Sequence, residues 1–137
     1  MPAAWERRVR KMRGEDWHPY SPMTFITPPF PGYVSGHSTV SAACAKTLEL
    51  FTGSDRFGGS VTFPVGSSRI EAGLTPAADL TLTWATFSNA ADQAGISRRY
   101  GGIHFEQGDL DARHTGRQAA QKCWDKAEAY INGTVAR

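Results

Sequence analysis

Residues 31–38 read Pro-Gly-Tyr-Val-Ser-Gly-His-Ser and run directly into a segment with helical periodicity. Apolar and small residues recur there at the spacing of one helical face, which predicts a helix over residues 38–52. Ser35, Gly36 and His37 then lie in or just before its first turn. A helix N-terminus presents unpaired N–H groups and a partial positive charge, so this stretch suits an oxyanion such as phosphate. The predicted apolar face comprises Val40, Ala43, Cys44, Thr47, Leu48 and Phe51.

A second stretch, residues 97–104, reads Ser-Arg-Arg-Tyr-Gly-Gly-Ile-His and looks like the other half of the same site. An arginine such as Arg98 offers a planar fork that matches two oxygens of a tetrahedral oxyanion. The two glycines let the backbone bend and approach a ligand closely. Two histidines, His37 and His104, can divide nucleophilic and acid–base work near neutral pH.

Length and composition limit the number of domains, the classes of partner and the membrane or secretory segments that the chain can have. The chain has 137 residues, 40% of them hydrophobic, which is enough for one domain or part of one. A formal net charge of +2 gives no argument for nucleic acid as a partner. The apolar runs are too short for a transmembrane span, and basic residues occupy the place of a secretory signal. We therefore expect a soluble protein and leave its compartment open.

The two cysteines, Cys44 and Cys123, lie far apart and lack the spacing of a metal site. We expect both to be buried on helices, and their positions do not imply a disulfide.

The rest of the chain divides into two parts. Residues 1–18 form a basic N-terminal segment, ended by a turn at residues 14–16, and read as a solvated surface or as the source of a cation for the anion site. Residues 19–137 form the folded part. It begins with the proline-rich loop of residues 19–34, whose aromatic residues indicate packing rather than disorder.

The remaining elements predict a mainly α fold with a small antiparallel hairpin. The hairpin pairs about residues 61–63 with 80–82. A second helix is expected over residues 83–100, with a break or a kink at Gly95. A third is expected over residues 109–132, with one apolar face. That face comprises Ala120, Cys123, Trp124, Ala127, Tyr130 and Ile131.

Together the two stretches resemble a known family. Pro-x-x-x-Ser-Gly-His at residues 31–37 and Ser-Arg-x5-His at residues 97–104 are similar to the second and third motifs of the superfamily that joins vanadium-dependent haloperoxidases and type 2 phosphatidic acid phosphatases. The wording is closest to the bacterial haloperoxidase-like branch. The resemblance runs from about residue 17 to residue 133 and implies a partial helical bundle, the C-terminal half of such a catalytic unit.

The resemblance also implies roles for the site residues. Ser35 and Gly36 would hydrogen-bond an oxygen of vanadate or phosphate, and Arg98 would clamp and neutralise the oxyanion. His37 would be the acid–base residue. His104 would bond directly to vanadium, or attack phosphorus in a phosphatase.

An acidic residue usually follows that histidine in the family and orients its ring. The fourth position after His104 is Gly108, so Asp109 is expected to take this role, although its place at a helix start fits a cap equally well.

One family motif is missing. The family carries Lys-x6-Arg-Pro upstream, whose two cations bind the oxyanion, and this sequence contains neither that pattern nor any Arg-Pro pair. Loss of two charge-assisted contacts, each about 1.5–3 kcal/mol, should weaken anion binding. A half bundle should also leave an apolar face uncovered, which favours self-association or pairing with a missing N-terminal half.

Three functions remain open at this stage. The first is a haloperoxidase that uses vanadate, hydrogen peroxide and halide. The second is a phosphatase that cleaves a phosphoester through a phosphohistidine at the same residues, because vanadate and phosphate are nearly isosteric. The third is a non-catalytic fragment or subunit, which the missing motif favours.

Overall fold

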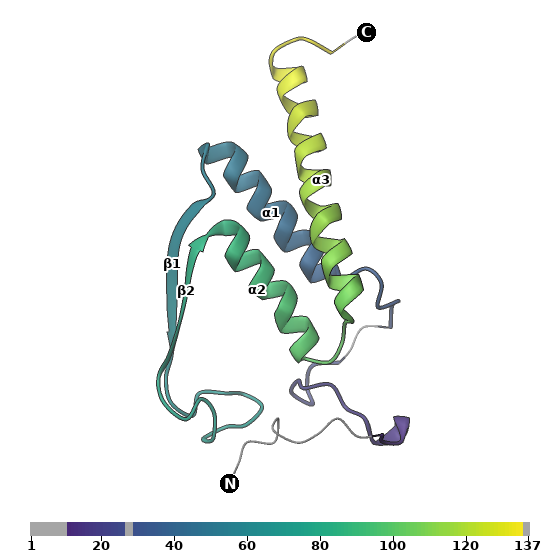
Figure 1. Cartoon of the computed structure of the whole chain (residues 1–137), viewed down its shortest axis with the longest axis vertical. Coiled ribbons are helices and arrows are strands. Elements are labelled where there is room, and N and C mark those ends of the chain that lie inside the picture. The colour runs from purple at the N-terminus through teal and green to yellow at the C-terminus, as the bar shows by residue number, and fades with distance from the viewer. Residues whose placement is uncertain (1–10, 27–28, 136–137) are drawn as a thin grey trace.

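The computed structural model of the chain describes residues 11–26 and 29–135. Expectations for residues 1–10, most of the basic segment, and for residues 27–28 of the proline-rich loop lie outside the described residues. Three helices and one hairpin make up the fold, so the mainly α prediction is confirmed (Figure 1). The elements are the short 3-10 helix η2 (Gly14–Asp16), α1 (Gly36–Thr52), β1 (Arg56–Phe63), β2 (Leu80–Thr86), α2 (Phe87–Tyr100) and α3 (Glu106–Ile131). None of the described helices is both long and apolar enough to cross a membrane.

The hairpin confirms the predicted pairing and extends it. Val61 lies opposite Leu82, and the two strands continue as far as Arg56 and Thr86. The prediction that the second helix begins at residue 83 is wrong, because Trp84 belongs to β2, where a Thr-rich alternating segment continues the ladder. The side chain of Thr86 then caps α2.

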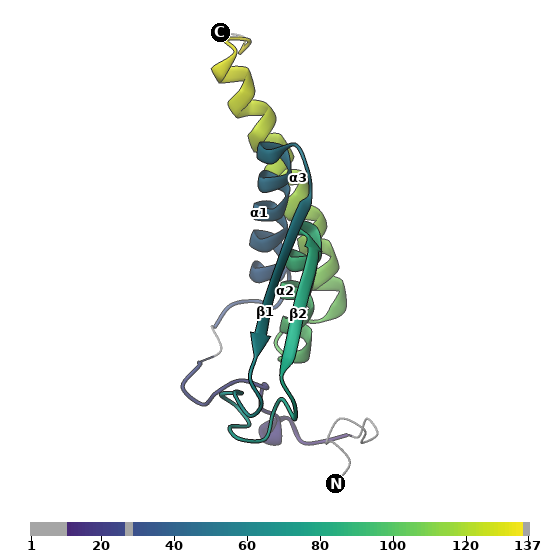
Figure 2. The ribbon, with the colours of Figure 1, turned by 90° about the vertical axis from the view of Figure 1, so that its left-hand side faces the viewer.

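The three helices pack side by side, and β2 of the hairpin packs on α2 (Figure 2). The most extensive helix contact is between α1 and α3, and α2 packs mainly on α1. Small residues make these contacts. A Cβ added at Gly116 of α3 would lie well inside 3.0 Å of the carbonyl oxygen of Thr39. The buried alanines are Ala42, Ala45, Ala91, Ala112 and Ala120.

This close packing overturns the predicted apolar faces. The buried residues of α1 are Ser38, Ala42 and Ala45, whereas Val40 is 63% exposed and Phe51 77% exposed. The contact between helices selects small side chains, and the larger apolar ones lie outside it. The predicted face of α3 is right at Ala120, which is buried, but it leaves Tyr130 and Ile131 exposed in the last turn.

The cysteine prediction is also wrong. Cys44 and Cys123 are both exposed, and both are free thiols.

A buried polar cluster joins the helices: Ser35, Ser38, Asp109 and Arg113. Asp109 is fully buried and receives Nε of Arg113 at 2.8 Å and a second guanidinium hydrogen bond. Ser38 lies 2.7 Å from the same carboxylate, across the α1–α3 contact. Gly95 of α2 covers the cluster, because an added Cβ there would lie inside 3.0 Å of Asp109. Gly95 is thus a close-packing position in a continuous helix, not the predicted break.

The direction of the hydrogen bonds in this cluster follows from the donor count. Ser38 Oγ lies within bonding distance of both Asp109 and Ser35, yet a hydroxyl has only one proton to donate. A carboxylate can only accept, so Ser38 donates to Asp109 and accepts from Ser35. The proton of the Ser35 hydroxyl is therefore directed into the cluster.

The same contacts keep Asp109 ionised. Burial alone raises the pKa of Asp109, but hydrogen bonds from Arg113 and Ser38 and the charges of Arg113 and Arg99 outweigh it. The pKa of this carboxyl therefore lies below its ordinary value of 3.8.

We expect Gly116→Ala to lower the midpoint of thermal unfolding, because the new methyl group meets backbone and must push α1 and α3 apart. The cost of such overpacking, about 1–3 kcal/mol, exceeds the gain in helix propensity of about 1 kcal/mol. Gly108→Ala in the same helix is the control, since its Cβ would make only ordinary contacts, the nearest at 3.5 Å. Equal midpoints for the two variants would contradict the proposed packing.

We expect Asp109→Asn to cost about 3–5 kcal/mol of unfolding free energy, because it leaves Arg113 buried without its main counter-charge. A carboxyl with a lowered folded pKa stabilises the chain above its unfolded pKa, and this stability is lost as the pH falls through the folded pKa. The parent chain should therefore lose stability below about pH 4, and the variant should lose less over that range. Asp125→Asn, at an exposed position on the same helix, should change neither quantity in urea titrations.

Candidate oxyanion site

Three helix ends meet at one end of the bundle: the N-termini of α1 and α3 and the C-terminus of α2 (Figure 1). The predicted motif stretches lie there. This arrangement follows from the alternating up-down-up course of the three helices, and it brings residues about sixty positions apart in the sequence to the same place.

The first stretch starts α1 as predicted. Ser35 is the N-cap, with extended backbone, and its side chain accepts a hydrogen bond from the N–H of Ser38. Its own N–H donates to the carbonyl of Gly108 at 3.1 Å, which ties the start of α1 to the first turn of α3.

The second stretch reverses the chain after α2, as its two glycines predict. The N–H of Gly102 donates to Arg99, and the N–H of Ile103 donates to Arg98. Gly102 has φ +74°, a conformation that side chains disfavour, and an added Cβ there would also press on the ring of Trp17. His104 follows this turn and points back into the fold, 9% exposed.

The ring of His104 is oriented by main chain rather than by an acid. Its Nδ1 lies 2.7 Å from the carbonyl oxygen of Gly32 in the proline-rich loop. A carbonyl only accepts, so Nδ1 carries a proton, and in the neutral imidazole the free lone pair is that of Nε2. This corrects the role expected of Asp109, whose carboxylate is engaged by Ser38 and Arg113 instead.

His37, Arg98 and His104 line one small cavity of about 60 Å³. One water needs roughly 10–15 Å³ of such space, so the cavity holds a few waters or one small oxyanion. Phe25, Phe30, Gly32 and Ile103 complete its walls. The cavity is a site of two imidazoles and one guanidinium enclosed by apolar side chains.

The two adjacent arginines have different partners. Arg99 pairs with Glu106 at 3.0 Å and lies 3.8 Å from Asp109. The Nε of Arg98 is buried and has no hydrogen-bond partner among the described residues. A buried donor without an acceptor is costly, and an oxyanion in the cavity would supply the acceptor. The residues present therefore fit an oxyanion such as vanadate or phosphate.

The surroundings of His37 lower the pKa of its imidazole. Partial desolvation, followed by the charges of Arg98 and His104, lowers the pKa of this exposed imidazole below its ordinary value of 6.5. His37 is therefore neutral at pH 7 and can accept a proton.

Ser35 and Gly36 lie outside this set. The structure brings His37, Arg98 and His104 together, whereas Ser35 is fully buried with its hydroxyl in the cluster of Asp109. Gly36 is exposed at the start of α1 and does not line the cavity either. Their predicted contacts with the oxyanion remain predictions.

Sequence reasoning missed the contribution of Gly32 and of the apolar walls. A main-chain carbonyl leaves no signature in residue type, and only the neighbouring Pro31 hinted that this backbone is fixed. Phe25 and Phe30 were expected to pack, but their place in the cavity wall depends on the path of the loop. Among the described residues, no group of three or more His, Cys, Asp or Glu side chains is placed to hold a metal cation.

Comparison with solved structures gives three informative matches. The holo-type bacterial vanadium-dependent chloroperoxidase is 26% identical with a TM-score of 0.72, over 80% of this chain and 23% of that one. The apo-type bacterial vanadium-dependent chloroperoxidase is 25% identical with a TM-score of 0.78, over 92% and 26%. The first bacterial vanadium-dependent iodoperoxidase is 34% identical with a TM-score of 0.53, over 78% and 22%. The chain thus spans about a quarter of the length of each. A search of the curated proteins found no match.

The family model described as "VCPO second helical-bundle domain" matches residues 3–133. This covers nearly the whole chain, both motif stretches and all three helices. Together with the solved structures, it confirms the resemblance seen in the sequence: the chain belongs to the VCPO second helical-bundle domain family, within the vanadium haloperoxidase-like superfamily.

Proposed function

We propose that this chain carries the histidine and arginine part of the oxyanion site of a vanadium-dependent haloperoxidase, which oxidises halide with hydrogen peroxide. The observation that carries the proposal is the small cavity that Arg98 lines together with His37 and His104, where the buried Nε of Arg98 has no hydrogen-bond partner in the part of the chain that the structure describes. Vanadate, when bound, would supply a Lewis acid that activates hydrogen peroxide toward halide.

The residues of the chain have distinct tasks in this proposal. His104, held by the carbonyl of Gly32, presents the lone pair of Nε2 toward the cavity. Arg98 neutralises the oxyanion and gives it a charge-assisted hydrogen bond. His37, neutral before the anion binds and protonated with it, can give its proton to a leaving oxygen and then, neutral again, accept one from the incoming peroxide.

The proposed site needs further cations. No Lys-x6-Arg-Pro pattern occurs in the sequence, and Arg98 is the one arginine among the described residues that lines the cavity. We infer that the remaining positive contacts come from outside the described residues, either from the basic segment of residues 1–10 or from another polypeptide, and that the described part alone binds vanadate weakly.

We expect Arg98→Ala to weaken orthovanadate binding, followed by vanadium NMR, by about ten- to a hundredfold, because one charge-assisted hydrogen bond is worth about 1.5–3 kcal/mol. Arg99→Ala is the matched control, since Arg99 pairs with Glu106 and does not line the cavity. Equal losses in both variants would argue against a specific role for Arg98.

His104→Ala should abolish peroxide-dependent bromination of a phenolic dye by the vanadate-loaded chain, because it removes the proposed bond to the oxyanion. Hydrolysis of a phosphomonoester without bromination would assign phosphatase chemistry to the same residues. If neither vanadate nor phosphate binds, the cavity is structural and the proposal fails.

We expect oxyanion binding to be coupled to proton uptake by His37. A bound anion offsets the positive surroundings that lower the pKa of this imidazole, so its pKa should rise on binding. Affinity should therefore increase as the pH falls from about 8 to about 6. His37→Gln should show only the smaller dependence that comes from ionisation of vanadate itself. The same pH slope in both proteins would exclude His37 as the coupled group.

A further inference from the structure

The last part of the proline-rich loop, residues 29–35, contains the carbonyl that holds the ring of His104. This carbonyl belongs to Gly32 and lies 2.7 Å from Nδ1 of the imidazole. A main-chain oxygen can orient an imidazole only if the loop that carries it is itself held in place. The contacts of this part of the loop therefore decide how Nε2 of His104 is presented to the oxyanion cavity.

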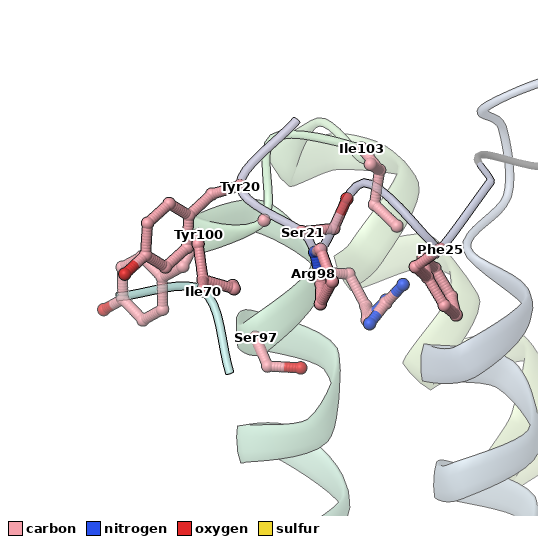
Figure 3. A pocket seen from close by; sticks show the side chains of 10 residues that line it. Tyr20, Ser21, Phe25, Ile70, Ser97, Arg98, Tyr100 and Ile103 are labelled. Atoms are coloured by element: carbon pink, nitrogen blue, oxygen red, sulfur yellow. The ribbon is translucent and has the colours of Figure 1, made fainter. Parts of the chain in front are cut away.

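The first part of the loop is fixed at the end of α2. The N–H of Tyr20 donates to the carbonyl of Gly101 at 3.0 Å. Figure 3 shows the guanidinium of Arg98 between Phe25 and Tyr20, so this part of the loop follows the C-terminal end of α2. These contacts precede Gly32 by several residues in the chain, and other contacts must place its carbonyl.

The last part of the loop is fixed on the first turns of α3. The N–H of Ser35 donates to the carbonyl of Gly108 at 3.1 Å. The hydroxyl of Tyr33 donates to Oδ2 of Asp111 at 3.0 Å. The carbonyl carbon of Gly32 is bonded to the backbone nitrogen of Tyr33, so the second hydrogen bond holds the residue that follows the orienting oxygen.

The carboxylate of Asp111 is itself held from its other side. Nε2 of Gln107 donates to Oδ1 of Asp111 at 2.8 Å, from one turn earlier on α3. The hydrogen bond to Asp111, followed by the charge of that carboxylate, raises the pKa of Tyr33 above its ordinary value of 10.0. The hydroxyl of Tyr33 therefore keeps its proton at neutral pH and remains a donor.

Gly108 allows the backbone of the loop to lie directly on α3. A Cβ at this position would lie 3.5 Å from the carbonyl oxygen of Gly32 and 3.6 Å from the ring of Tyr33, which is ordinary van der Waals contact. The side of the Tyr33 residue away from this contact faces solvent, since the residue is 68% exposed. Burial alone does not hold Tyr33 in place, and its hydroxyl supplies a directional contact.

We propose that Tyr33 and Asp111 are positioning residues for His104. Their hydrogen bond ties the loop to α3, keeps the carbonyl of Gly32 within reach of Nδ1, and so keeps the lone pair of Nε2 directed at the oxyanion cavity. Neither side chain lines this cavity, so both act through Gly32. The inference rests on the proposed function for the task of His104, but the orientation of the ring is measurable without any anion.

The test follows the two ring nitrogens of His104 by nitrogen NMR, without vanadate, in the neutral imidazole at about pH 8. In the parent chain the proton should reside on Nδ1. Tyr33→Phe keeps the ring and removes the hydroxyl, and should raise the ratio of the Nε2–H form to the Nδ1–H form by about two- to tenfold, as loss of one hydrogen bond implies. Asp111→Ala should have the same effect, and the double variant should add nothing to it. Tyr130→Phe, at an exposed tyrosine in the last turn of α3, is the matched control and should change nothing.

The same proteins are then titrated with orthovanadate, and affinity should fall by a similar factor in Tyr33→Phe and Asp111→Ala. An unchanged tautomer ratio in Tyr33→Phe, or equal changes in Tyr33→Phe and Tyr130→Phe, would overturn the inference. A shifted ratio with unchanged orthovanadate affinity would also overturn it, because the ring orientation would then have no effect at the site. A shifted ratio in a parent chain that binds no orthovanadate would support the positioning of His104 and count against the proposed function instead.

Discussion

The buried carboxylate of Asp109 is the constraint on which the helix arrangement depends. A fully buried charge is tolerated only when it is paired and hydrogen-bonded, and Arg113 and Ser38 meet this requirement from α3 and α1. Helix α2 must come close enough to cover the cluster. Only a residue without a side chain permits this approach, and Gly95 occupies that position. The cluster around this carboxylate, through Ser38 of α1 and Gly95 of α2, thus fixes the spacing of the three helices.

The spacing of the three helices sets the geometry of the candidate site. The helix ends that carry His37, Arg98 and His104 lie just beyond the cluster, where the hydrogen bond between Ser35 and Gly108 holds α1 against α3. The proline-rich loop then adds the final contact, because the carbonyl of Gly32 sets the tautomer of His104. Stability and site geometry therefore come from neighbouring but different residues: a carboxylate for the bundle and a carbonyl for the imidazole.

Local patterns in the sequence predicted the elements well where one signal dominated. Helical periodicity located α1, and strand-like alternation located the hairpin. The prediction for the start of α2 was wrong, because small residues and Trp84 fit a helical face as readily as a strand. Pairing with β1 places Trp84 in a strand. The predicted faces failed for another reason: close helix packing buries the smallest side chains, not the most apolar ones.

The sequence by itself determined which chemistry is available: two motif stretches, with their arginine and two histidines, and the family to which they point. Residue types and short spacings suffice for this, because a cap, a glycine turn and a charged fork are local properties. Only the tertiary structure decided that Asp109 pairs with Arg113 rather than with His104, and that the carbonyl of Gly32 holds the ring of His104. These pairings depend on which residue, distant in sequence, lies next to each polar group in the fold. A buried charge without a partner is strongly destabilising, so few alternative pairings are possible.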